Sequence, residues 1–128
     1  MAIVLPALPR GTSTARLESI AIATAALLKA DRNAALRRQA QVATEIDARS
    51  RTVRSGATGR ILHVPDDVSI DTLLSERCGR GVGIPTVLFF ASGMSCGGVI
   101  ALTRTDRSYQ IRVNWLTGAI EIAAASAS

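Results

Sequence analysis

The chain has 128 residues, of which 48% are hydrophobic and 20% are charged, and its formal net charge is +5. This length suits one domain with one hydrophobic core, and this composition excludes an intrinsically disordered chain. No apolar run reaches the roughly 18 residues of a transmembrane helix, and the opening MAIVLPALPRG is too short for a secretory signal.

The first predicted element is one long helix. Hydroxyl residues at 12–14 offer an N-cap, and the following ARLESIAIATAALLKADRNAALRRQ contains neither Gly nor Pro. Thr24 and Asp31 interrupt its apolar stripe. A helix of about 25 residues is about 40 Å long, so we expect it to span the domain. The apolar stripe comprises Leu17, Ile20, Ala21, Leu27, Leu28 and Ala35.

After the helix the hydrophobic pattern changes to a period of two. Residues 42–47 predict a first strand, and SRTVRSGATG at 50–59 predicts a polar turn. Short strands are expected at 60–64 and 68–70. The glycine-rich segment SERCGRGVG, residues 75–83, is predicted to be a loop.

The strongest strand signals follow residue 84. IPTVLFFA, GVIALTR, SYQIRVNW and AIEIA are separated by turn residues and predict antiparallel strands joined by hairpins. Tyr109, Ile111, Val113 and Trp115 share one face, which we expect in the core. The final AAASAS is expected to fray. A helix followed only by strands indicates an α+β fold with the helix packed on antiparallel sheet.

The two cysteines, Cys78 and Cys96, lie in or beside glycine-rich turns. Neither belongs to a CxxC pair or lies near histidines that could complete a zinc site, so no metal or other cofactor is expected. A disulfide between them would stabilise the fold in an oxidising compartment. Two free thiols are the alternative that the residues leave open.

The stretch FFASGMSCGG, residues 89–98, matches the G-x-S-x-G spacing around Ser95. In esterases this motif lies between a strand and a helix, and an acid and a histidine follow it in the chain. Here it joins two predicted strands, and the single histidine, His63, lies upstream. A thiol pair of Cys96 with His63 has no further support. We therefore expect no catalytic residue, and a Ser95 hydrolase is a remote alternative.

Arginines gather in the first half of the chain and could contact phosphates. Aromatic residues that would stack on bases are few, so any nucleic-acid binding would be nonspecific and salt-sensitive. A solvated face is the other interpretation. The arginines concerned are Arg32, Arg37, Arg38, Arg49, Arg51, Arg54 and Arg60.

The segment from residue 84 to residue 122 resembles the carboxy-terminal part of the H-type minor pseudopilins of bacterial type II secretion, the GspH/FimT family. The shared order is a strand ending in Phe, a Gly-Ser-rich turn, a Gly-Gly strand start, a Tyr-containing strand and a Leu-Thr-Gly turn. The helix ending in NAALRRQAQVATEID is also similar. The matching residues are Phe89, Phe90, Gly93, Ser95, Gly97, Gly98, Tyr109, Trp115, Leu116, Thr117 and Gly118.

This resemblance implies a pilin-like fold in which the glycines serve backbone geometry. Gly93, Gly97 and Gly98 would supply freedom at a hairpin, and Gly118 a positive φ in the next turn. It also implies a non-enzymatic subunit of the pseudopilus, near its tip, that takes part in assembly and protein export. The expected partners are other minor pseudopilins and secreted substrate, contacted through the helix face and the loops at 49–60 and 75–83.

Family members begin with a hydrophobic helix that is cleaved, methylated and anchored in the inner membrane. The resemblance therefore implies that residues 1–11 are the remnant of such a helix and that residues 12–128 form a single periplasmic domain. A periplasmic location favours pairing of Cys78 with Cys96. The alternative within the same fold is a minor type IV pilin that binds DNA during uptake.

Overall fold

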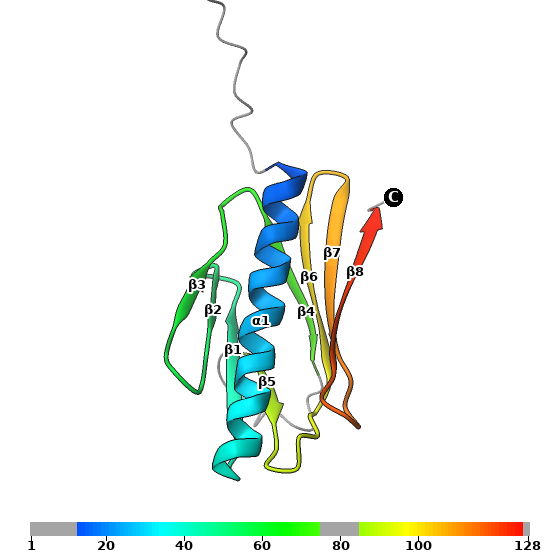
Figure 1. Cartoon of the computed structure of the whole chain (residues 1–128). Coiled ribbons are helices and arrows are strands. Elements are labelled where there is room, and N and C mark those ends of the chain that lie inside the picture. The colour runs from blue at the N-terminus through cyan, green and yellow to red at the C-terminus, as the bar shows by residue number, and fades with distance from the viewer. Residues whose placement is uncertain (1–12, 75–84, 127–128) are drawn as a thin grey trace, which may run out of the picture.

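The computed structural model describes residues 13–74 and 85–126, in which one helix precedes eight strands (Figure 1). The order confirms the predicted α+β class. The predicted remnant at 1–11 and the predicted loop at 75–83 lie outside the described residues. The elements are α1 (Thr14–Arg38), β1 (Val42–Asp47), β2 (Thr52–Arg54), β3 (Ile61–His63), β4 (Ser69–Leu74), β5 (Thr86–Phe89), β6 (Gly98–Arg104), β7 (Arg107–Val113) and β8 (Ile120–Ser126).

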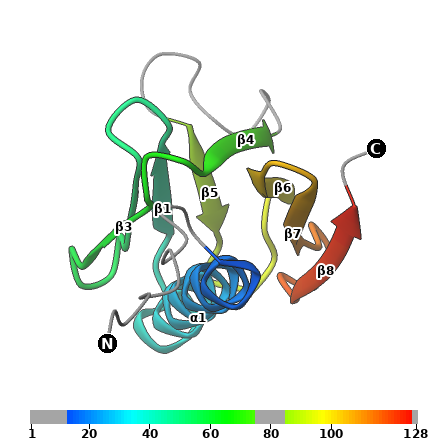
Figure 2. The same ribbon diagram turned by 90° about the horizontal axis from the view of Figure 1, so that it is seen from above.

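The strands form two antiparallel sheets of four, ordered β3-β2-β1-β5 and β4-β6-β7-β8. Seen from above, both sheets lie on the same side of α1, the first toward the left and the second toward the right (Figure 2). The helix packs on β1 and β5 of the first sheet and on β6, β7 and β8 of the second. The core lies between the helix and the two sheets, and its largest fully buried side chains include Leu17, Leu28, Ile46, Val53, Phe89, Ile100, Leu102 and Ile111.

Helix α1 begins and ends as its sequence predicts. The Ser13 side chain accepts a hydrogen bond from the Arg16 backbone N–H, and Gln39 closes the helix in the left-handed conformation. The helix runs alongside the strands over most of their length (Figure 1). Its buried face differs from the predicted stripe, because Leu27 is only partly buried whereas Thr24 is fully buried. Thr24 satisfies its hydroxyl by donating to the Ile20 carbonyl at 2.8 Å.

Asp31, the second polar residue in that stripe, is fully buried in the middle of α1. Its carboxyl group accepts hydrogen bonds from the Thr44 hydroxyl at 2.6 Å and the Ser55 hydroxyl at 2.5 Å. The backbone N–H groups of Gly56 and Ala57 donate to it at 3.0 and 3.3 Å. These four donors fix the helix to β1 and to the loop that follows β2.

The segment predicted as a turn at 50–59 contains β2, which is a correction to the sequence prediction. Val53 is fully buried and pairs with Ile46 of β1. The connecting turn is closed by Asp47, whose Oδ1 accepts from the backbone N–H groups of Arg49 and Ser50. Hydrogen bonds from Ser50 and Arg49 hold the pKa of Asp47 below its ordinary value. One buried valine and a closed turn thus suffice for a strand among polar residues.

The predicted core face of β7 is buried at Tyr109, Ile111 and Val113 but not at Trp115. Trp115 is 61% exposed, so its assignment to the core was wrong. The strand ends at Val113, and Asn114 then starts a turn by accepting hydrogen bonds from the backbone N–H groups of the third and fourth turn residues, Leu116 and Thr117. The alternation of faces therefore stops before it reaches Trp115.

The end of the chain is also more ordered than predicted. Residues 123–126, expected to fray, belong to β8, and Ser126 pairs with Arg107. Backbone hydrogen bonds to β7 hold these small residues in the strand.

We predict that Asp31→Ala lowers the free energy of unfolding by about 3 kcal/mol, because two buried hydroxyl donors and two part-buried N–H donors lose their acceptor. Urea unfolding followed by circular dichroism measures the change. Asp106→Ala, at an exposed turn residue, should change stability by less than about 0.5 kcal/mol. Equal effects of the two substitutions would contradict a structural role for the Asp31 carboxyl group.

Candidate functional site

Ser95 lies in the turn between β5 and β6 and is 4% exposed. Its hydroxyl donates to the Leu88 carbonyl at 2.6 Å and accepts from the Gly97 backbone N–H at 3.1 Å. The Ser95 backbone N–H in turn donates to the Trp115 carbonyl. A hydroxyl whose proton is held by a carbonyl oxygen has no general base to activate it. Ser95 therefore fastens the turn to β5 and to the β7–β8 hairpin.

His63 does not approach Ser95 or Cys96. It is exposed on β3, at one edge of the first sheet, whereas Ser95 bridges to Phe89 of β5 at the other edge. Three strand spacings of about 4.8 Å separate β3 from β5, or roughly 14 Å. The structure therefore brings His63 close to neither Ser95 nor Cys96, so neither of these alternative pairs is formed.

Cys96 is disulfide-bonded and therefore does not act as a thiolate. The expected partner, Cys78, lies outside the described residues, so the pairing of these two residues stays a prediction. In the part of the chain that the structure describes, no group of three or more His, Cys, Asp or Glu side chains could hold a metal ion.

The four glycines expected at turns all have positive φ: 89° at Gly93, 75° at Gly97, 151° at Gly98 and 71° at Gly118. Gly118 is the most constrained, since a Cβ there would lie 2.1 Å from the Gly93 carbonyl oxygen and 2.8 Å from Nε of Arg32. The turns before β6 and before β8 thus touch backbone to backbone. Only glycine permits both this conformation and this approach.

Arg32 connects α1 to the hairpin between β7 and β8. Its Nε and Nη2 donate to the Thr117 carbonyl at 3.1 and 2.9 Å. Arg38 donates to the Ala57 carbonyl, and Arg51 donates to the Val68 carbonyl. Three of the seven arginines considered as phosphate contacts are therefore bound to backbone carbonyls at three separate places.

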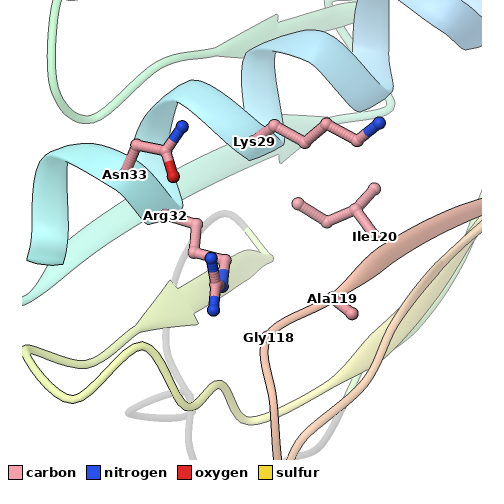
Figure 3. A pocket seen from close by; sticks show the side chains of 6 residues that line it. All are labelled: Lys29, Arg32, Asn33, Gly118, Ala119 and Ile120. Carbon is pink, nitrogen blue, oxygen red and sulfur yellow. The ribbon is translucent and has the colours of Figure 1, made fainter.

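Beside Arg32, a hollow of about 280 Å³ lies between α1 and the start of β8 (Figure 3). Lys29, Arg32 and Asn33 line it from the helix, and Gly118, Ala119 and Ile120 line it from the hairpin. Sequence reasoning did not find this hollow, because its two sides are about 85 residues apart in the chain and only the tertiary structure brings them together.

The outward face of α1, which the sequence predicts to be a contact surface, carries no charge along one stripe. Its residues recur at spacings of three and four, all are exposed, and none is charged. An exposed helix face is normally polar and charged. Ile22 on this face is 53% exposed. This uncharged stripe consists of Ala15, Ser19, Ile22, Ala26, Ala30 and Asn33.

A hollow of about 270 Å³ borders the uncharged stripe at Ala26 and Ala30 and is closed on its far side by Arg60 and Leu62. Small residues on a helix allow another backbone to approach closely. Within the described residues, no helix is both long and apolar enough to cross a membrane. Because the stripe consists mostly of small, uncharged residues, a further helix could pack closely against it.

Solved structures of other proteins share this fold. No protein-family model and no curated protein matches the chain. The crystal structure of the type IV minor pilin FimU of Pseudomonas aeruginosa matches with a TM-score of 0.64 at 16% identity, over 85% of this chain and 89% of that one. The minor pseudopilin EpsH of the type 2 secretion system of Vibrio cholerae matches with a TM-score of 0.62 at 14% identity, over 84% and 94% of the two chains. The chain has the pilin-like fold of these minor pilins and pseudopilins.

We predict that Gly118→Ala destabilises the protein by about 3 kcal/mol, the sum of a left-handed alanine and a backbone clash. The matched control is Gly59→Ala, which has a similar φ of 76° but no atom within 4 Å of the added Cβ. That variant should lose about 1 kcal/mol. Thermal unfolding compares the two, and equal losses would show that contact with Gly93 is unimportant.

Ser95→Ala should lower the free energy of unfolding by about 1–2 kcal/mol, because the Leu88 carbonyl and the Gly97 N–H lose their partner. Hydrolysis of an activated ester should proceed at the same rate with this variant and with the parent protein. A rate that depends on Ser95 would restore the hydrolase alternative. Ser92→Ala, at an exposed serine of the same turn, serves as the control for stability.

Proposed function

We propose that this chain is a minor pseudopilin, a non-enzymatic subunit that joins other pilin-like subunits in the pseudopilus of a type II secretion system. The observation that carries the proposal is the uncharged stripe on α1 of a pilin-like fold. A face of this kind, opposite the core, is explained by contact with helices of neighbouring subunits. The proposed role needs surface complementarity and no reacting group.

The position of the stripe supports an assembly role. The stripe extends from Ala15 to Asn33 along the side of α1 that faces away from both sheets. Neighbouring helices could therefore pack against it without disturbing the core. The stripe residues themselves carry no charge, and Lys29 lies at the edge of the stripe, three residues after Ala26.

The second candidate is a minor type IV pilin, which the likeness to FimU favours as strongly as the likeness to EpsH favours a pseudopilin. Deleting the gene in its own bacterium distinguishes the two. A pseudopilin predicts loss of protein secretion with surface pili retained, and a type IV minor pilin predicts the reverse. If neither process changes, both assignments are wrong.

Binding of DNA by such a pilin would use the remaining exposed arginines. Affinity for a DNA duplex, measured as salt is raised, tests it: submicromolar binding that weakens steeply would favour the uptake role. We expect weak binding, since Arg32, Arg38 and Arg51 are bound to carbonyl groups.

We predict that Ala26→Glu reduces co-purification with the other minor subunits at least about tenfold, because a carboxylate would be buried in the helix contact. Folding should be preserved, since Ala26 is exposed and Glu is a good helix former. Ala48→Glu, the same change at an exposed turn residue, should co-purify normally. Normal assembly of the Ala26 variant would show that the stripe is not the contact surface.

A further inference from the structure

The hollow beside Arg32 has an unbalanced charge. In Figure 3 the Lys29 side chain extends from α1 past Ile120, and the Arg32 side chain extends from α1 toward the hairpin segment that carries Gly118. Among the described residues, ion pairs involve Arg51 and Arg104 but neither of these two cations. Both guanidinium contacts of Arg32 go to a neutral carbonyl, that of Thr117. The hollow therefore carries two positive charges, and no carboxylate of the described residues 13–74 and 85–126 forms an ion pair with either.

The carboxylates nearest in sequence point elsewhere. Asp31 points about 100° away from Arg32 around the helix and accepts hydrogen bonds from Thr44 of β1 and from Ser55 after β2. Glu121 pairs across the strands with Arg112, on the face of β8 opposite to that of Ile120, because successive side chains alternate. Glu18 lies 11 residues before Lys29 on the helix, or about 16 Å away. None of these three carboxylates is therefore placed to form an ion pair with Lys29 or Arg32.

An exposed apolar group lies on the same hairpin. Trp115 and Leu116 are 61% and 55% exposed at the turn whose Thr117 carbonyl Arg32 holds. Tryptophan and arginine are both enriched at the centre of protein interfaces. The hydrogen bonds of Asn114 to Leu116 and Thr117 make this turn rigid, so binding there would cost little ordering.

We propose that the hollow and the adjoining Trp115–Leu116 tip form a docking site for an acidic segment of a partner protein, with a carboxylate between Lys29 and Arg32 and an apolar side chain against Trp115. Charge complementarity requires an anion, and the apolar tip favours a peptide over nucleic acid. Two cations are also too few for useful affinity to a duplex, which depends on several phosphate contacts. The site adjoins the uncharged stripe at Asn33, which lines the hollow, and it does not rest on the proposed pseudopilin role.

The sequence offers two site-specific reporters for the test. Lys29 is the chain's one lysine and Trp115 its one tryptophan. The probe is a capped hexapeptide in which two glutamates flank a leucine, and its control carries glutamines instead. We expect the glutamate peptide to shift the Trp115 emission to shorter wavelength. A carbodiimide, which joins an amine to a carboxylate, should couple the peptide to Lys29, as mapped by mass spectrometry.

Lys29→Glu should raise the dissociation constant for this peptide about tenfold. Arg16→Glu, the same charge change on an exposed residue about 20 Å along the same helix, should leave it within about twofold. Circular dichroism checks that both variants fold. The proposal is wrong if the glutamine peptide binds equally well, if no emission shift or coupling occurs, or if duplex DNA or inorganic phosphate binds more tightly with the same dependence on Lys29.

Discussion

A carboxyl group buried in the middle of a helix is tolerated only where hydrogen-bond donors surround it. Asp31 meets this condition by accepting from Thr44 on β1 and from Ser55, Gly56 and Ala57 after β2. The first sheet can therefore occupy only one position along α1. The close packing of the loop against β1 follows, since a Cβ at Gly56 would lie 2.0 Å from the Ala43 carbonyl oxygen.

Arg32, the next residue of the helix, fixes the second sheet to α1 as Asp31 fixes the first. Arg32 points about 100° away from Asp31 around the helix and holds the Thr117 carbonyl of the β7–β8 hairpin. Gly118 then brings this hairpin against Gly93 in the turn before β6. Two consecutive polar side chains thus orient two sheets on one helix, while the apolar core between them supplies most of the stability.

The surfaces that the fold does not use carry the proposed functions. One is the uncharged stripe of α1, opposite the core, and the other is the cationic hollow with its exposed tryptophan. Both lie on rigid elements, which suits recognition by surface contact. Ser95, by contrast, is committed to the Leu88 carbonyl and has the structural role of closing a turn. The resemblance in the sequence and the likeness of the fold both lead to pilin-like subunits.

The sequence by itself determined most of the strands and the long helix with an N-cap among residues 12–14, because these follow from local periodicity and backbone preference. The turn glycines were expected from the family resemblance, and they have positive φ values. It misplaced Trp115 and missed β2, since a strand end and a single buried valine depend on what packs around them. Only the tertiary structure decided that Asp31 is buried and that Lys29 and Arg32 face a hairpin about 85 residues away. The reason is that the hydrophobic periodicity of a segment reports its own secondary structure and not which distant segment it contacts.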